Sequence, residues 1–365
     1  MDFKEIIVKW YAANKRDLPW RNTNNPYFIW IAEVILQQTR VAQGLSYYHR
    51  FIETFPTIKS LAEADIDKVM KVWQGLGYYS RARNLQNGAK QVMNDYGGKL
   101  PNSFEELIKI KGIGPYSAGA IASFAFKKIA PAIDGNVYRV LSRVFGVFSS
   151  SETAAGKKEF FRLTMDLIDT KHPDTFNQAL LDFGALQCIP RNPICLECPF
   201  NEICYAYRNN LVNQLPVKGK KIASRDRFFN YIIIRYKDST FIQRREIGDI
   251  WTSLYEFPLI ETISSVETEE LIKQNAWKEL FGKNEFKILY ISQPIKHLLS
   301  HQTLYTKFII VEITKPNYLL KSNYLKISTS TIQEYSVPKV IDNFLAAEPS
   351  EIYLSGAGKL TNKKK

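Results

Sequence analysis

The chain has 365 residues, more than one hydrophobic core usually organises, so its length predicts two domains. Lys and Arg total 49 against 36 Asp and Glu, and the net charge of +13 favours a polyanion such as nucleic acid as a partner, although it also fits a membrane-surface protein. The N-terminal residues lack the pattern of a signal peptide, and no stretch is apolar enough to span a bilayer. We therefore expect a soluble, cytoplasmic protein.

The first half of the chain, from Phe3 to about residue 185, carries apolar residues at helical spacing and is expected to be all-helical. One segment of it, Phe28 to Gln37, is apolar around its whole circumference except at Glu33, which is the pattern of a buried helix. Burial disfavours an ionised carboxylate, so we expect Glu33 either to join a salt bridge or to keep its proton through a raised pKa. The polar residues Gln37 to Arg40 follow at once and indicate a cleft at the end of this helix.

A glycine-containing turn joins two helical stretches between Leu107 and Ala120. Gly112 and Gly114 allow a phosphate to approach the backbone closely, and Pro115 suits the first turn of the second helix, whose free amides can bind that phosphate. The pattern is that of a helix-hairpin-helix clip for the DNA backbone, although a Gly-x-Gly sequence also serves simply to end a helix.

A second acid, Asp134, stands just before another helical run and is followed by Gly135 and Asn136. An aspartate in this place is often only the N-cap of the helix. Its surroundings are nevertheless more polar than those of Glu33, and two acids in contrasting surroundings are typical of glycoside cleavage, where one donates a proton and the other stabilises positive charge.

All four cysteines of the chain fall within one short stretch with the spacing C-x6-C-x2-C-x5-C, at Cys188, Cys195, Cys198 and Cys204. Thiolates this close in sequence predict a metal centre, since an intracellular chain keeps its thiols reduced instead of forming two disulfides. Zinc and a four-iron, four-sulfur cluster both accept four thiolates, and the spacing does not separate them.

The pattern of residue types along the chain changes after the cysteines. Helical periodicity is lost in a basic stretch that we expect to be a linker, and β-branched and aromatic runs follow, with a helical segment around Glu269 to Phe281 between them. The sequence thus predicts a helical domain over 1–207 that includes the cysteine loop 188–204, a linker over 208–226, an α+β domain over 227–348, and a disordered basic tail over 349–365.

Together these features resemble the MutY-type adenine DNA glycosylases of the helix-hairpin-helix superfamily, and the resemblance covers nearly the whole chain. It rests on the glycine hairpin, the cysteine loop and four further stretches: Leu18 to Arg21, Glu33 to Arg40, Gly75 to Tyr79 and Ile133 to Val137. It implies a mainly α N-terminal domain with a [4Fe-4S] cluster on the four cysteines and an α+β, Nudix-like C-terminal domain. It also implies removal of adenine paired with 8-oxoguanine or guanine in double-stranded DNA.

The resemblance implies roles for the residues of a catalytic pocket. Glu33 matches the general acid that protonates adenine at N7, and Asp134 matches the carboxylate that stabilises the positive sugar. Asn136 and Tyr116 match further residues of the same pocket. Tyr116 stands where related bifunctional enzymes carry a lysine that forms a Schiff base, so we expect a monofunctional enzyme without lyase activity.

The resemblance also implies contacts with DNA. Arg21 and Gln178 correspond to contacts with the extruded adenine, and Gln38 matches a side chain inserted into the duplex beside the lesion. Ser300 and His301 lie in a loop that the family uses to recognise 8-oxoguanine.

Two departures from the family pattern lie in the second domain. Leu299 occupies a place where phenylalanine is common, and Tyr255 one where tryptophan is common. No pyrophosphatase signature follows Pro258, so we expect this domain to bind and not to hydrolyse nucleotides.

Two alternatives remain open on the sequence. The first is an endonuclease-type pyrimidine glycosylase and lyase of the same superfamily, and the second is a non-catalytic, metal-stabilised DNA-binding protein. In each case we expect a monomer that associates with the nucleoid through DNA and has no membrane partner.

Overall fold

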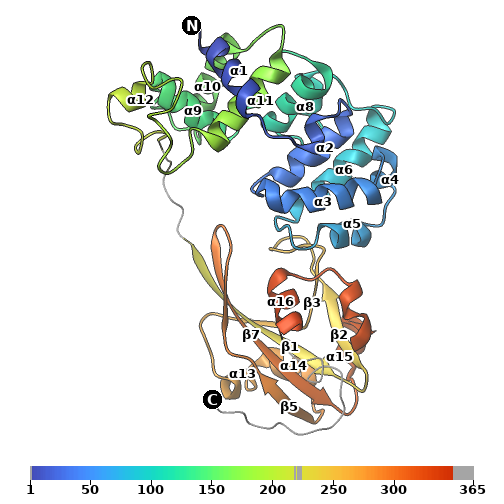
Figure 1. Ribbon diagram of the computed structural model, residues 1–365. Helices are drawn as coiled ribbons and strands as arrows, with labels where there is room; N and C mark the ends of the chain where they lie inside the picture. The colour runs from blue at the N-terminus through green and yellow to red at the C-terminus, as the bar shows by residue number, and fades with distance from the viewer. Residues whose placement is uncertain (1, 218, 220–223, 348–365) are drawn as a thin grey trace. The chain divides into compact units, whose positions relative to one another are not determined.

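The computed structural model describes residues 2–217, 219 and 224–347 (Figure 1). Contacts divide the chain into a first unit, Met1–Asp65 with Arg81–Lys221, and a second unit, Ile66–Ser80 with Ile222–Lys365. The predicted tail over 349–365 lies outside the described residues, as does part of the predicted linker. The domain boundaries that we drew from the sequence stay predictions.

The first part of the chain is helical, as the periodicity predicts. Every element between residues 2 and 217 is a helix. One of these helices, α5, belongs by its contacts to the second unit. The helices are α1 (Phe3–Asn14), η1 (Pro19–Arg21), α2 (Pro26–Leu36), α3 (Val41–Thr54), α4 (Ile58–Ala62), α5 (Ile66–Trp73), α6 (Ser80–Asp95), α7 (Phe104–Leu107), α8 (Pro115–Phe126), α9 (Gly135–Phe145), α10 (Ala154–Leu167), α11 (Pro173–Leu186) and α12 (Tyr205–Arg208).

Helices α2 and α8 form the centre of the first unit. Helix α2 begins at Pro26, and the Asn25 side chain caps it by accepting a hydrogen bond from the Tyr27 amide at 3.0 Å. Helix α8 is built largely from alanine, serine and glycine, so its backbone approaches its neighbours closely. A Cβ at Gly119 would lie 2.0 Å from the carbonyl oxygen of Pro131, so only glycine fits there.

The second unit is an α+β structure, as predicted. Its larger sheet has the strand order β4-β1-β7-β5 with β6 also paired to β7, and its smaller sheet has the order β3-β2-β8. Strands β1 and β7 run parallel, whereas the other pairs are antiparallel. The strands are β1 (Arg225–Arg235), β2 (Ser239–Arg244), β3 (Tyr255–Glu256), β4 (Leu259–Thr262), β5 (Phe286–Ile291), β6 (Ile295–Leu298), β7 (Gln302–Ile313) and β8 (Leu325–Ser328).

Both faces of the larger sheet are covered (Figure 1). Because side chains alternate along a strand, Phe229 and Tyr231 of β1 join one core and Ile232 and Ile234 join the other. Residues of α16 (Lys339–Ala347) pack into the first core and residues of α14 (Asn275–Phe281) into the second. Besides α5, the remaining helices that the structure describes in this unit are α13 (Thr268–Leu271), α15 (Tyr318–Asn323) and η2 (Thr329–Glu334).

Across the part of the chain that the structure describes, no helix combines the length and the apolar character needed to cross a bilayer.

Candidate active site

A cavity of about 530 Å³ in the first unit brings together the residues that the sequence predicts for catalysis. Its lining comes from η1 and the residues just before it, from the end of α2 and the turn after it, from both ends of α8, from the start of α9 and from α11. Among the residues that line it are Arg21, Glu33, Gln38, Tyr116, Asp134, Asn136 and Gln178.

Glu33 is a buried acid, as predicted, with only 4 % of its surface exposed. Burial raises its pKa to about 7, and the charge of Asp134 acts in the same direction, whereas the Tyr116 hydroxyl and the Arg21 guanidinium oppose the rise. The Tyr116 hydroxyl, on the first turn of α8, donates a hydrogen bond to Glu33 Oε2 at 2.5 Å. Glu33 therefore keeps a proton up to near neutral pH at the wall of a cavity.

Asp134 serves both as a cap and as a wall of the cavity. Its Oδ1 accepts hydrogen bonds from the amides of Asn136 and Val137 at 2.8 and 2.9 Å. Asp134 is therefore the N-cap of α9, a role that the sequence also allowed. The Asn136 side-chain amide donates to Asp134 Oδ2 at 2.7 Å, and Arg139 in turn holds Asn136 Oδ1 at 2.8 Å. Burial raises the pKa of Asp134, but these hydrogen bonds oppose the rise. The carboxylate is thus fixed in orientation.

The turn that carries Gln38 is held by a buried arginine that sequence reasoning missed. Arg81 of α6 donates hydrogen bonds to the carbonyl oxygens of Val34, Ile35 and Gln37, which lie at the C-terminal end of α2. These acceptors have no partner within the helix, so the guanidinium stabilises its end. Gln38 follows in the left-handed backbone region, with φ of 57°, and its side chain is exposed.

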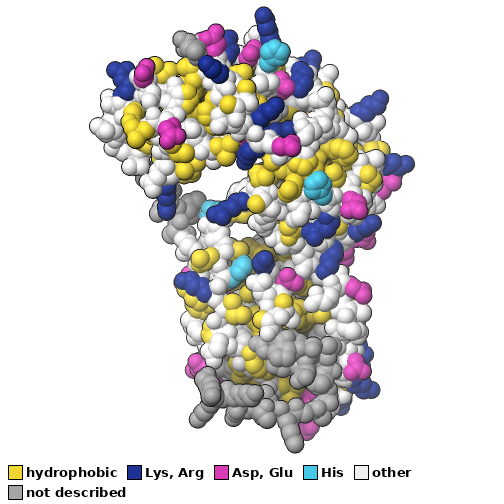
Figure 2. Space-filling model, in the orientation of Figure 1, with side chains coloured by type: hydrophobic (Ala, Val, Ile, Leu, Met, Phe, Trp, Pro, Cys, Tyr) yellow, Lys and Arg dark blue, Asp and Glu magenta, His cyan; other side chains and the backbone are white. Residues whose placement is uncertain are grey.

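The predicted glycine hairpin joins α7 to α8 and lies at the surface. Gly112 has φ of 85°, in the left-handed region that favours glycine, and Gly114 is the N-cap residue of α8. Both glycines are exposed, whereas Ile113 between them is buried with 4 % of its surface exposed and anchors the turn. The hairpin therefore presents backbone outward at the start of a helix. On the face shown in Figure 2, Lys and Arg side chains are spread widely over the surface.

The four cysteines line one small enclosure of about 20 Å³ in the first unit. None of them forms a disulfide. Arg143 of α9 supports the loop, since its guanidinium donates to the carbonyl oxygens of Ile189 and Pro190 at 2.8 and 3.1 Å. No three metal-ligating side chains of the described residues converge on the position of a single ion.

The predicted recognition residues Ser300 and His301 lie in the second unit, at the exposed turn between β6 and β7. Leu299 is partly buried and packs against the core of this unit, whereas Leu298 has 69 % of its surface exposed. The Tyr78 hydroxyl, which belongs to the same unit, lies 2.8 Å from Ser300 Oγ.

Two profiles of known families match the chain. The HhH-GPD superfamily of base excision DNA repair proteins matches residues 31–165, and the NUDIX domain matches residues 230–347. The first unit is similar in structure to a thermostable thymine-DNA glycosylase, with a TM-score of 0.53, 31 % identity, and 57 % of this chain and 95 % of that chain covered. It shares its fold with endonuclease III in a non-covalent complex with DNA, with a TM-score of 0.50, 23 % identity, and 57 % and 94 % of the two chains covered. Fold and site together define a helix-hairpin-helix base excision repair protein with a Nudix-like second domain.

Curated relatives narrow this class. The adenine DNA glycosylase of Buchnera aphidicola subsp. Baizongia pistaciae is 36 % identical over 88 % of this chain and 89 % of its own length. The mouse adenine DNA glycosylase is 40 % identical over 58 % of this chain and 43 % of its own length. The chain belongs to the adenine DNA glycosylase family, whose members are hydrolases of N-glycosyl bonds in base excision repair.

Proposed function

We propose that the protein removes adenine paired with 8-oxoguanine or guanine from double-stranded DNA, with Glu33 as general acid and Asp134 as the stabiliser of the sugar cation. The observation that carries this proposal is a carboxyl group with a pKa of about 7 beside a second, hydrogen-bonded carboxylate in one cavity. Burial raises the pKa of both acids, but hydrogen bonds from two backbone amides and from Asn136 favour the ionised form of Asp134, so the pair can supply a proton donor and an electrostatic stabiliser.

The reaction begins with extrusion of the adenine nucleotide, because a stacked base gives no access to its glycosidic bond. Gln38 is suited to fill the vacated space, since its side chain projects from an exposed turn beside the cavity. Arg21 and Gln178 line the cavity that receives the base.

Glu33 then transfers its proton to N7 of adenine, and the bond between N9 and C1′ breaks as the base leaves neutral. The sugar becomes an oxocarbenium-like cation, which the fixed Asp134 carboxylate stabilises. Water adds to C1′ and loses a proton, leaving an abasic site. Tyr116 donates to Glu33 Oε2 and thereby favours release of the proton from the other oxygen of the carboxyl group.

We propose that the enzyme has no lyase activity. A Schiff base requires an amine, and the described residues that line the cavity include no lysine. Tyr116 stands where related enzymes carry that lysine, and its hydroxyl is engaged by Glu33.

We propose that the cysteines hold a [4Fe-4S] cluster. The four thiols line one shared pocket, and four thiolates are the ligand set that such a cluster accepts, one on each iron. When bound, the cluster supplies a structural core for the loop. The surface near it would then present backbone and basic side chains to DNA phosphates, together with the hairpin of Gly112 and Gly114.

In the second unit, Ser300 and His301 are placed in an exposed turn and offer hydrogen-bonding groups to the base opposite adenine. The unit is proposed to bind 8-oxoguanine without hydrolysing it. The whole protein needs no second copy for these steps, and we propose a monomer.

An excision assay tests these proposals together. The full-length protein is incubated with duplexes that carry adenine opposite 8-oxoguanine, adenine opposite guanine, adenine opposite thymine, or thymine glycol, and strand cleavage is read with and without alkali. We expect alkali-dependent cleavage only at adenine in the first two duplexes. Cleavage at thymine glycol, cleavage without alkali, or a borohydride-trapped adduct would contradict the proposal.

A further inference from the structure

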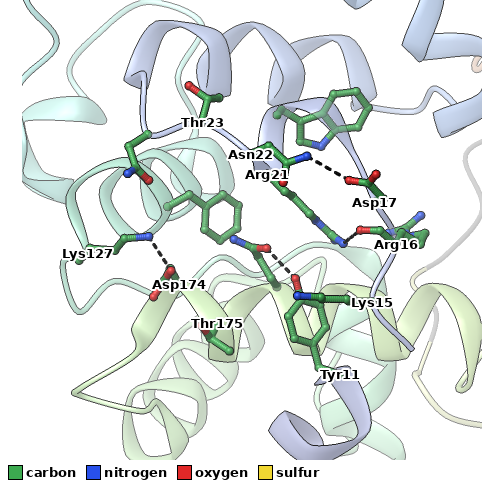
Figure 3. Close-up of a pocket in the computed structure, with 14 residues that line it drawn as sticks. Tyr11, Lys15, Arg16, Asp17, Arg21, Asn22, Thr23, Lys127, Asp174 and Thr175 are labelled. Atoms are coloured by element: carbon green, nitrogen blue, oxygen red, sulfur yellow. Dashed lines mark hydrogen bonds and ion pairs between the residues drawn. The ribbon is translucent and has the colours of Figure 1, made fainter. Parts of the chain in front are cut away.

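The same unit contains a second cavity of about 360 Å³, and Figure 3 shows the residues that line it. The two cavities share five lining residues, namely Arg16, Trp20, Arg21, Phe124 and Gln178. Tyr11 lines the second cavity and Glu33 lines the first. The two cavities are therefore adjacent. We call the five shared side chains the wall of the base cavity, and its polar members must be held in one orientation to act on a base.

Asp182 of α11 anchors the arginines of this wall. Its side chain is fully buried, and its Oδ2 and Oδ1 accept hydrogen bonds from Nη1 and Nη2 of Arg21 at 2.6 and 2.7 Å. Arg16 adds a hydrogen bond from Nε to Oδ1 at 2.8 Å. Burial works to raise the pKa of Asp182, but the two guanidiniums outweigh it and hold the pKa below its ordinary value. Asp182 is thus ionised and is the fixed point of an ionic triad.

The triad orients Arg21 in a single way. Nη1 of Arg21 also donates to the carbonyl oxygen of Arg16 at 3.0 Å, so both hydrogens of Nη1 and one hydrogen of Nη2 are engaged. The Nε hydrogen has no acceptor among the residues that the structure describes, and Arg21 lines the base cavity. Because a guanidinium is planar, fixing one edge fixes the other.

Tyr11 of α1 orients Gln178, which lies one helical turn before Asp182 on α11. The Tyr11 hydroxyl donates to Gln178 Oε1 at 2.7 Å, and this hydrogen bond is drawn in Figure 3. A terminal amide rotates freely between two nearly equivalent orientations unless one is selected by a partner. The hydrogen bond from Tyr11 thus selects the orientation in which Oε1 is engaged, whereas Nε2 has no partner among the described residues and Gln178 also lines the base cavity.

We propose that Asp182 and Tyr11 are positioning residues for adenine excision, which together turn the wall of the base cavity into a row of N–H donors. Asp182 acts through Arg21, and Tyr11 acts through Gln178. Such a wall matches a ring edge that carries unprotonated nitrogens, as adenine does, and disfavours a ring edge that carries an N–H. This proposal rests on the proposed function, because it concerns the base that the cavity receives.

A double-mutant cycle tests the role of Tyr11. We compare Tyr11→Phe, Gln178→Leu and the double variant in single-turnover excision of adenine opposite 8-oxoguanine, with the duplex dissociation constant and the melting temperature measured alongside. Tyr27→Phe is the matched control, because the Tyr27 hydroxyl also makes a buried hydrogen bond, to the carbonyl oxygen of Phe55 at 2.8 Å, away from the cavity.

We expect Tyr11→Phe to slow excision roughly five- to tenfold at unchanged duplex affinity, and the double variant to be no slower than Gln178→Leu, since each works through the same amide. Tyr27→Phe should lower the melting temperature without slowing excision. Excision by Tyr11→Phe at the wild-type rate, or a double variant whose loss is the product of the single losses, would overturn the role of Tyr11. Excision of adenine by the wild-type protein in the same assay supports the proposed function whichever result the variants give.

The role of Asp182 is tested by Asp182→Asn, read through the pH dependence of excision. The charged and titratable groups that face Glu33 are Tyr116 from α8, Asp134 from the start of α9 and Arg21 from η1. Loss of the Asp182 charge leaves two unneutralised guanidiniums near Glu33, so we expect a slower reaction whose decline with rising pH begins at lower pH than in the wild type. If this variant fails to fold, Asp182→Asn combined with Arg16→Gln restores the net charge and is measured instead. A folded variant with the wild-type rate and pH profile would overturn the assignment.

Discussion

The pKa values of two buried carboxyl groups in the first unit are shifted in opposite directions because the partners of the two groups differ. Asp182 meets two guanidiniums, which hold its pKa below the ordinary value. For Glu33, burial raises the pKa to about 7 with the help of the Asp134 charge, because the Tyr116 hydroxyl and Arg21 oppose the rise only in part. Burial alone therefore does not decide the protonation state; the charges within reach decide it. The first carboxyl group is a fixed anion that binds two cations, and the second keeps its proton to near neutral pH, as the proposed general acid requires.

The first prediction concerns Glu33→Gln. The amide keeps the shape of the side chain and can still accept the hydrogen bond from Tyr116, but it has no acidic proton. Because general acid catalysis contributes about 100-fold or more, we expect at least that loss in the single-turnover rate of excision. Duplex affinity and the circular dichroism spectrum should match the wild type. Near-normal cleavage by this variant would exclude Glu33 as the acid.

The raised pKa of Glu33 also predicts a pH dependence of stability. Between its ordinary pKa of 4.5 and about 7, the folded protein binds more protons than the unfolded chain, so stability falls as pH rises through this window and stays lower above it. The penalty is at most about 3 kcal/mol, at about 1.4 kcal/mol for each tenfold change in proton affinity. Glu33→Gln removes it, so the variant should gain stability over the wild type at pH 8 relative to pH 5. The same difference in the free energy of unfolding between the variant and the wild type at both pH values would refute this.

The sequence could reveal some of these residues and not others. Glu33 was predictable because it interrupts a helix that is apolar all round, and the structure buries it. Asp182 carries the same signal, since it stands between Leu181 and Phe183, and it was overlooked. Tyr11 gave no signal, because its partner Gln178 is 167 positions away and a tyrosine at helical spacing has the pattern of a core residue.

At the scale of elements, the distance between α2 and α8 sets the geometry of the acid. Tyr116 reaches Glu33 only because the small residues of α8 let its backbone pack closely in the core. Gly119 has the least space of these positions, since an added Cβ would lie 2.0 Å from the carbonyl oxygen of Pro131. A backbone atom cannot move aside as the end of a flexible side chain can. Gly119 thus lets α8 pack closely against Pro131 and Ala132, in the segment that leads to Asp134.

Gly119→Ala tests this close packing. We expect a loss of about 1–3 kcal/mol in the free energy of unfolding, because backbone must shift to admit the methyl group. Gly135→Ala is the control, since a Cβ there meets no atom within 4 Å. Thermal and denaturant unfolding measure both. Equal stability of the two variants would show that α8 has room to move and that the close packing is not required.

The elements themselves were predictable where their periodicity is long. The helical first half and the strands that became β1 and β7 follow the sequence pattern, and the Nudix-like α+β character of the second part was expected. The helical segment expected around Glu269 to Phe281 is interrupted, and forms α13 and α14. The parallel pairing of β1 with β7 had no local signal, because Arg225 pairs with Gln302 across a long stretch of chain.

At the scale of the whole molecule, the residues proposed for catalysis and those proposed for recognition of 8-oxoguanine belong to different units. The cavity with Glu33 and Asp134 belongs to the first unit, and the turn with Ser300 and His301 belongs to the second. The two tasks are therefore separable by mutation, since no residue of the turn lines the cavity among the described residues.

His301→Ala tests this separation. We expect slower excision of adenine opposite 8-oxoguanine, by roughly tenfold for the loss of one hydrogen-bonding group, with little change opposite guanine. His49→Ala, an exposed histidine of the first unit, is the control and should alter neither rate. Equal losses on both duplexes would show that the turn contributes to general DNA binding instead of reading the oxidised base.

The most direct test of the central claim is a titration of the Glu33 carboxyl group in the full-length protein bound to a duplex with a non-cleavable adenine analogue. Carbon-detected NMR of protein labelled at the glutamate carboxyl, with Glu33→Gln used to assign the signal, reports its protonation at each pH. The account predicts that the group keeps its proton up to near pH 7. A carboxyl group already ionised at pH 5 would contradict it.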